Sequence, residues 1–431
     1  MYRKPQKNAT RTLCMSAPRT ASAIPVPCPG LDLLLTCARW PQDATDRELI
    51  RQHSAKPLDW QLFLQLAQHH RLAPLVWHNL RVAVDTPTNP AQESAFEQLQ
   101  QLASANTLQS LRSLAELRRI AQKFQSHRIP LRVLKGLPLA QSVYGDLSLR
   151  AAGDLDLLID EPSILEADRL LRSFGYRGLF PLHRLTPKRL AFYRAHWKDL
   201  AYRNPTTGFE IDLHWRCFRN PDMPGASLIA ASAAQAVSFG SLQVTTMPPM
   251  ENLLYLCVHG TLDGWLYLKS LADVAAQVRP MDAAQLKTLA TLAAHHGILP
   301  ELTAALILAH RYFNANCLGF PLLPEDHPIV AHILRFTHRS LEQNAFLAGR
   351  DSIPARATLA FEIGLRPTLH YRRELVLRVL FRARMWQTLP LPDRLFPLYP
   401  LLSPVEWLAF RLRRWLAKPS AVTLKSEAAP F

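Results

Sequence analysis

Residues 154–159 read DLDLLI, and this stretch decides the predicted fold. Side chains in a β-strand point alternately to opposite faces, so the alternation of acidic and apolar residues predicts a strand. Asp154 and Asp156 then share one face, with their Cα atoms about 6–7 Å apart by the strand rise. Leu155 and Leu157 share the opposite face and can pack into a core. Carboxylates are rarely buried unless they are paired or bound to metal, so these two acids need an explanation.

The segments around this strand predict a compact unit of strands and helices. Upstream, residues 131–136 (LRVLKG) read as a short strand that ends in a glycine turn, and residues 137–145 read as a short helix. Downstream, residues 163–175 read as a helix that a glycine ends. Two more strands are predicted at 198–204 and 209–215, because the turn-rich sequence NPTTG joins them.

Asp212 lies in the second of these later strands and adds a third acid to the pattern. If its strand neighbours residues 154–159, the three carboxylates form one cluster. Mg²⁺ prefers carboxylate oxygens and keeps water ligands that a substrate phosphate can replace. A cluster of this kind can hold two cations about 3.5–4 Å apart. We therefore interpret Asp154, Asp156 and Asp212 as a Mg²⁺ site, the alternative being an ordinary strand with one solvent-exposed face.

Three residues near the acids predict phosphate binding. Lys135 and Gly136 lie at a turn between a strand and a helix, where free backbone N–H groups bind phosphate. Lys135 adds a positive charge at this turn. Arg150 precedes Asp154 by four residues and can bind a phosphate in a bidentate way.

Three other side chains each allow two interpretations. His214 lies two residues after Asp212 on the same strand face, so it either contacts substrate or metal or is a buried, hydrogen-bonded histidine. Lys269 either forms a helix ion pair with Asp273, four residues later, or reaches a bound triphosphate. Tyr144 is either a core residue or a stacking surface for a base.

Composition bounds the class of protein. The chain has 431 residues, 48% of them hydrophobic, so a sizeable core is expected. The net charge of +16 favours a polyanionic partner such as a nucleotide, nucleic acid or phospholipid surface, unless it only reflects an Arg-rich surface. The six cysteines have no CxxC or CxxH spacing, which favours reduced thiols in a cytoplasmic protein. No apolar run is long enough for a transmembrane helix.

The regions flanking the α/β unit read as helical, and residues 90–125 in the first of them predict a long amphipathic helix. We expect a disordered basic extension at 1–29, a helical region at 30–128, an α/β core at 129–248, a helical domain at 249–418 and a flexible tail at 419–431. Residues 404–418 form a basic amphipathic pattern that suits either weak contact with a membrane surface or packing on the core. The predicted class is therefore α+β, a small mixed-sheet core embedded between N-terminal and C-terminal helical regions.

Three motifs together resemble a known family: residues 134–159 (LKGLPLAQSVYGDLSLRAAGDLDLLI), 209–216 (FEIDLHWR) and 258–275 (VHGTLDGWLYLKSLADVA). They are similar to a bacterial nucleotidyltransferase family within the DNA polymerase beta-like superfamily. The resemblance covers most of the chain. It implies that Asp154, Asp156 and Asp212 are the metal ligands and that Lys135, Gly136 and Arg150 lie in the phosphate-facing region. Leu137 departs from the superfamily pattern, in which serine or glycine follows the turn glycine.

The residues and the resemblance lead to one predicted activity. We expect a Mg²⁺-dependent nucleotidyltransferase that moves a nucleoside monophosphate from an NTP to an acceptor hydroxyl. In this hypothesis Lys135, Arg150 and Lys269 neutralise the triphosphate. A sugar, a protein side chain and an RNA end all remain open as the acceptor. The alternative is a nucleotide-binding or scaffold protein that retains the fold without turnover.

Overall fold

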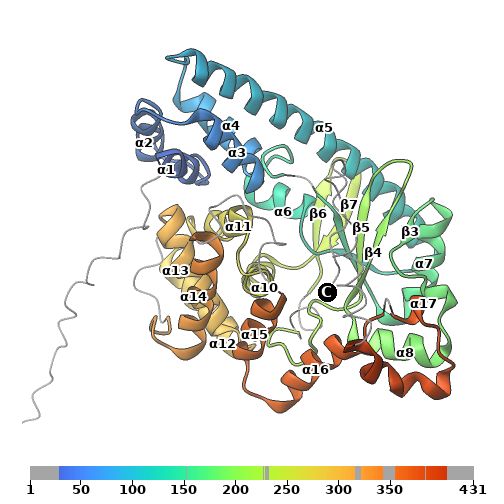
Figure 1. Ribbon diagram of the computed structural model, residues 1–431. Coiled ribbons are helices and arrows are strands. Elements are labelled where there is room, and N and C mark those ends of the chain that lie inside the picture. Colours follow the sequence, from blue (N-terminus) through green and yellow to red (C-terminus); the bar gives the residue numbers. More distant parts are fainter. Residues whose placement is uncertain are drawn as a thin grey trace, which may run out of the picture.

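The computed structural model describes residues 29–151, 153–226, 228, 233–315, 322–342, 355–383 and 385–404. Within these ranges a mixed β-sheet is flanked by helices on both sides (Figure 1). The expected extension before Pro29, the basic helix beyond residue 404 and the expected tail lie outside the described residues.

The sheet is wider than the small sheet that the sequence predicted. Its order is β3-β4-β5-β2-β1-β7-β6. The strands are β1 (Leu131–Val133), β2 (Leu155–Ile159), β3 (Arg177–Gly178), β4 (Asp199–Arg203), β5 (Glu210–His214), β6 (Gln235–Phe239) and β7 (Leu242–Thr246). The pairs β2·β5 and β1·β7 are parallel, whereas β1·β2, β3·β4, β4·β5 and β6·β7 are antiparallel. The structure therefore confirms an α+β fold built on a mixed sheet.

The β6–β7 hairpin was not predicted. Its two strands are joined at Gly240 and Ser241, and Gly240 has φ +59°, a left-handed conformation that glycine adopts at little steric cost. In β6 and β7 buried and more exposed residues alternate. That alternation, ending in a Gly-Ser turn, was a usable signal for a hairpin in the sequence.

Between residues 29 and 126 the described chain forms five helices: α1 (Pro29–Cys37), α2 (Ala44–Ser54), α3 (Trp60–His69), α4 (Ala73–Ala83) and α5 (Pro90–Ser126). Polar N-caps explain where three of them begin. Asp43 forms a capping box with Asp46, Asp59 accepts from the Leu62 amide, and Asn89 accepts from the Gln92 amide. Helix α5 is the long amphipathic helix expected after Pro90, and it runs from the N-terminal helices to the sheet (Figure 1).

The second group of helices follows the sheet. It comprises α10 (Pro249–Leu262), α11 (Leu268–Val278), α12 (Ala283–His295), α13 (Leu299–Phe313), α14 (Pro328–Glu342) and α15 (Ala355–Leu365). Their buried apolar residues join those of α1–α4 in one cluster. The two helical regions that flank the α/β core in sequence therefore share one hydrophobic core in space, which lies beside the sheet (Figure 1).

A second apolar cluster belongs to the sheet. It contains residues of β1, β2, β4 and β5, together with helices on the sheet and a segment near the C-terminus. The remaining elements are α6 (Leu137–Leu139), η1 (Ala140–Tyr144), η2 (Glu161–Ser163), α7 (Ile164–Ser173), η3 (Leu182–Arg184), α8 (Pro187–His196), α16 (Leu369–Leu380), α17 (Met385–Thr388) and η5 (Asp393–Leu398). Residues 385–402 thus pack with the sheet, although they follow the helical region in sequence.

Among the described residues, no helix combines the length and the apolar character that a membrane crossing requires. Three of the cysteines, Cys37, Cys217 and Cys257, lie among the described residues, and all three are buried.

Candidate active site

Strand register brings two of the predicted acids side by side. The parallel pairing of β2 and β5 sets Asp156 directly opposite Asp212, and Leu158 opposite His214. All five residues of β2 are buried, so Asp156 is only 3% exposed. Asp156 and Asp212 are 56 positions apart in the chain, and only the pairing of β2 with β5 makes them neighbours.

Asp156 is held by two positively charged or hydrogen-bonding partners. Lys135 Nζ lies 3.3 Å from Asp156 Oδ1, and Nε2 of His214 lies 3.2 Å from the same oxygen. Burial alone would raise the pKa of Asp156, but Lys135 and His214 more than offset it and hold this pKa well below its usual range. Burial would likewise lower the pKa of Lys135, yet the carboxylates of Asp156, Asp154 and Asp263 hold it above its ordinary value. Asp156 is therefore ionised in the folded protein.

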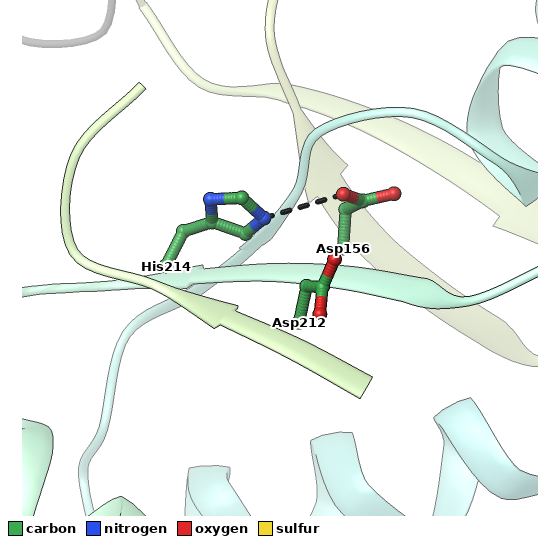
Figure 2. A group of neighbouring side chains, drawn as sticks. All are labelled: Asp156, Asp212 and His214. Carbon is green, nitrogen blue, oxygen red and sulfur yellow. Dashed lines mark hydrogen bonds and ion pairs between the residues drawn. The ribbon is translucent and has the colours of Figure 1, made fainter. Parts of the chain in front are cut away.

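Asp212 has the opposite environment. Burial and the carboxylates of Asp154, Asp156 and Asp199 raise its pKa to about 8. Ligand atoms of Asp156, Asp212 and His214 all lie within 4.8 Å of one another, and Figure 2 shows these three side chains gathered over neighbouring strands. Two carboxylates and an imidazole form a donor set that fits a divalent cation. The mutual repulsion of the carboxylates favours a cation between them.

Asp154 lies just before β2 and outside that group of three. Its carboxylate is half-buried, and its charge acts on both Lys135 and Asp212. The turn after β1 also reaches this point. Gly136 has φ +77° and ψ −120°, a region open almost only to glycine, and a Cβ there would lie 4.0 Å from the Asp154 carbonyl oxygen. The expected glycine turn is therefore present next to the first acid.

Two further residues of the site, Lys198 and Asp199, were not predicted from the sequence. In the β4·β5 pairing Asp199 lies opposite His214, and Lys198 forms an ion pair with Asp199. Nζ of Lys198 lies 3.5 Å from Nδ1 of His214, whose Nε2 faces Asp156. His214 is 2% exposed, so it is a buried, hydrogen-bonded histidine that is also one of the three residues of the donor group. Residues 198–204, which begin with KDL, were predicted as a strand. Asp199 lies two residues before Ala201, which pairs with Asp212, so this acid was a signal in the sequence for a further site residue.

Arg150 forms an ion pair with a carboxylate of the protein itself. Its guanidinium forms a bidentate pair with Asp273 of α11, with Nε and Nη2 2.9–3.0 Å from the carboxylate oxygens. The Tyr144 hydroxyl donates to the same carboxylate at 2.9 Å. Arg150 and Asp273 are 8% and 1% exposed. The core interpretation of Tyr144 is therefore confirmed, and Arg150 joins the segment before β2 to the helical core.

Lys269 does not form the helix ion pair with Asp273 that was one of its two interpretations. Asp273 instead bonds to Arg150 and Tyr144, and Lys269 has no ion-pair partner among the described residues. Burial, and then the charge of Arg150, lower the pKa of Lys269 to about 7, although Asp273 opposes this shift. The lysine lies in the first turn of α11, close enough to Lys135 for the two charges to interact.

A comparison with known families identifies the class of this site. A family model described as an uncharacterised nucleotidyltransferase matches residues 56–314, more than half of the chain. The chain belongs to this family. The match begins before α3 and ends with α13, so the family unit includes the sheet and parts of both helical regions. No match was found among curated proteins or solved structures.

Family membership confirms the resemblance that the motifs predicted, and with it an enzyme of the nucleotidyl-transfer class. The structure brings Lys135, Asp156 and Asp212 into one site, with Asp154 and Gly136 at its edge. Arg150 and Lys269 lie on the α11 side of this site. The roles of these residues remain predictions.

Proposed function

We propose that the protein is a Mg²⁺-dependent nucleotidyltransferase that uses an NTP as donor and a hydroxyl group as acceptor. The observation that carries this proposal is the register of Asp156 and Asp212 beside Lys135, in a member of a nucleotidyltransferase family. A carboxylate cluster with an unfavourable excess of negative charge suits a divalent cation, and a lysine beside it suits the phosphates that such a cation accompanies.

The proposed reaction transfers a nucleoside monophosphate. The acceptor oxygen forms a bond to the α-phosphorus of the NTP, the bond from that phosphorus to the oxygen of the β-phosphate breaks, and pyrophosphate leaves. Asp212 takes the proton of the acceptor hydroxyl. Asp154, Asp156 and Asp212 would hold the Mg²⁺, which when bound neutralises phosphate charge and activates the acceptor oxygen. Lys135, whose Nζ lies 3.3 Å from Asp156 Oδ1, neutralises the phosphates.

The supporting residues keep these groups in place. Lys198 and Asp199 fix the ring of His214, and His214 orients the carboxylate of Asp156. Arg150 holds Asp273 and thereby fixes α11 beside the site. The acceptor hydroxyl belongs to a sugar, a protein side chain or an RNA end, all of which suit this chemistry.

Binding calorimetry with Asp212→Asn tests the proposal. Asparagine keeps the shape of the side chain and removes one of the mutually repelling charges, so we expect this variant to fold with an undiminished melting temperature. Wild type should bind one or more NTPs in the presence of Mg²⁺ and much more weakly in EDTA. Asp212→Asn should lose about tenfold or more of the Mg²⁺-dependent affinity, whereas Asp85→Asn, an exposed acid after α4, should not.

Transfer is measured with NTPs labelled at the α-phosphate and candidate acceptors of the three classes. Label transferred by wild type and lost in Asp212→Asn supports the proposal. Metal-dependent binding without transfer to any acceptor would favour the alternative of a nucleotide-binding protein without turnover. Absence of NTP binding by well-folded wild type would overturn the proposal.

A further inference from the structure

We propose that Arg71, in the turn between α3 and α4, and Lys269, in the first turn of α11, form a binding subsite for the β- and γ-phosphates of the nucleotide. This inference rests on the proposed function and deepens it, because it assigns the position of the triphosphate and adds a residue from the N-terminal helices to the site. Neither the motifs nor the family match pointed to Arg71.

Arg71 approaches the segment before β2 from a part of the chain far away in sequence. Its guanidinium lies over the ring of Tyr267, 5.0 Å from the ring centre. Its Nη1 lies 4.0 Å from the position that a Cβ on Gly153 would occupy, and Gly153 directly precedes Asp154. Tyr267 is itself the N-cap of α11. The arginine therefore lies between the start of α11 and the residue next to the first acid.

The backbone at Arg71 explains how its side chain is presented. The Arg71 amide donates to the Gln68 carbonyl and the Leu72 amide to the Ala67 carbonyl, the pattern of a Schellman motif that ends α3. Arg71 has φ +56° in this motif, where glycine is the usual residue. Arg128 occupies the equivalent position at the end of α5 with φ +57°, where its amide donates to the Gln125 carbonyl and the Ile129 amide donates to the Phe124 carbonyl. The chain thus contains a second arginine in the same local structure.

The cations around Lys269 are of two kinds: those that pair with a carboxylate of the protein and those that do not. The charges that act on Lys269 are those of Arg150, Asp273, Arg71 and Lys135. Arg150 is paired with Asp273, and Lys135 is paired with Asp156. Arg71 and Lys269 form no ion pair with any carboxylate in the part of the chain that the structure describes. Two cations that pair with no described carboxylate therefore lie at the start of α11, close enough for their charges to interact.

These two cations lie next to segments that lead to the carboxylates: Arg71 lies beside Gly153, which precedes Asp154, and Lys269 is close enough to Lys135, the partner of Asp156, for the two charges to interact. A ligand that satisfies both regions must carry several negative charges and bring a divalent cation for the carboxylates. The triphosphate of an NTP with its Mg²⁺ has this chemistry: its inner part meets the carboxylates through the cation, and its outer phosphates meet Arg71 and Lys269. The same arrangement retains pyrophosphate as the leaving group.

The experiment uses two matched pairs of variants in the full chain. Arg71→Gly and Arg128→Gly remove the same side chain from the same backbone conformation, and glycine fits a positive φ, so both variants should fold. Arg128 is exposed and lies before β1. The site residue Lys135 lies after the other end of this strand, so Arg128 is a control at the opposite end of β1. Lys269→Met is paired with Lys287→Met, which changes an exposed lysine on α12. Calorimetry measures binding of inorganic tripolyphosphate in EDTA and of NTP with Mg²⁺.

We expect Arg71→Gly and Lys269→Met each to weaken both ligands by about tenfold or more, the loss of one charge-assisted contact. Arg128→Gly and Lys287→Met should bind like wild type. Wild-type affinity for tripolyphosphate in Arg71→Gly would overturn the subsite, even if NTP still binds and the proposed function stands. Binding of tripolyphosphate through these residues without any NTP binding would support the subsite and overturn the proposed function. Failure of wild type to bind either ligand would overturn both.

Discussion

At the scale of single residues, charged side chains in the site fall into pairs that are satisfied and groups that are not. Asp156 and Lys135 pair with each other, and each has a pKa shifted in the direction that favours its charged form. Asp212 and Lys269 form no ion pair within the described ranges, and their pKa values move to about 8 and about 7, in the directions that disfavour charge. Unsatisfied charge of both signs in one site is typical of residues kept for a ligand.

The stability of Lys269→Met should depend on pH. The pKa of Lys269 lies near 7 in the folded protein and near 10.5 in the unfolded chain. Between these values the unfolded chain holds a proton that the folded protein has lost, so this group makes the protein more stable as pH rises from 7 to 10. At pH 6 the cost of burying the charge is fully present. The variant should therefore melt above wild type at pH 6, and the difference should shrink by pH 10.

Differential scanning calorimetry at pH 6 and pH 9–10, without phosphate or nucleotide, measures this difference. Lys287→Met is the control, because its side chain is exposed, and it should follow the wild-type profile. A melting difference that does not change with pH would contradict a lowered pKa at Lys269.

At the scale of elements, the site is assembled from a strand pair and a helix that are joined through one buried cluster. The carboxylate of Asp273 on α11 pairs with Arg150, which lies in the segment before β2. It also accepts a hydrogen bond from the Tyr144 hydroxyl at the end of η1. Three elements of the chain thus meet at one carboxylate, and this cluster sets where α11 and Lys269 lie relative to β2. A buried charge that loses its partner is costly, so the cluster is a sensitive point of the fold.

Asp273→Asn should lower the free energy of unfolding by about 3–5 kcal/mol, because the buried Arg150 would keep its charge without a counter-ion. Tyr144→Phe removes one hydrogen bond to a charged group and should cost about 1.5–3 kcal/mol. The double variant Arg150→Met/Asp273→Leu removes both charges and should recover much of the loss. Urea denaturation followed by circular dichroism measures all three. A single variant Asp273→Asn as stable as wild type would mean that Arg150 is not buried with this partner.

At the scale of the whole molecule, chain order and spatial order differ. The helices on both sides of the α/β core share one apolar cluster, whereas residues near the C-terminus belong to the sheet cluster. Trp386 of α17 is 3% exposed and contacts Phe180, Tyr193 and Phe396 with ring centres 5.3–6.4 Å apart. Arg189 of α8 also pairs with Asp393 at 3.0 Å. The C-terminal segment therefore stabilises the half of the molecule that carries the acids.

Trp386→Ala should destabilise the protein by about 3–5 kcal/mol, since it leaves a large cavity among aromatic rings. Leu401 lies in the same segment but is 72% exposed, so Leu401→Ala should change stability by no more than about 0.5 kcal/mol. The urea midpoint measures both. Amide hydrogen exchange locates the effect: in Trp386→Ala we expect faster exchange in β4 and α8 and little change in α13. Equal exchange throughout would contradict the assignment of this segment to the sheet.

The sequence by itself determined the local structure and the chemical class. Alternation in DLDLLI predicted β2, the turn at Gly136 was correctly placed, helical periodicity predicted α5, and the motifs led to the family. These features depend on residues close together in the chain, where strand or helix geometry acts directly. The β6–β7 hairpin was not predicted, although its alternation and its Gly-Ser turn are local features of the same kind.

Only the tertiary structure decided which charges meet. The register that sets Asp156 opposite Asp212, the pairing of Arg150 with Asp273, and the approach of Arg71 to Gly153 join segments far apart in sequence. Each arises from packing of whole elements, and a one-residue change of register would turn every side chain of a strand to its other face. Local patterns carry no information on such contacts. The chemistry of the acids could therefore be predicted from the chain, but their partners and the environment that sets their pKa values could not.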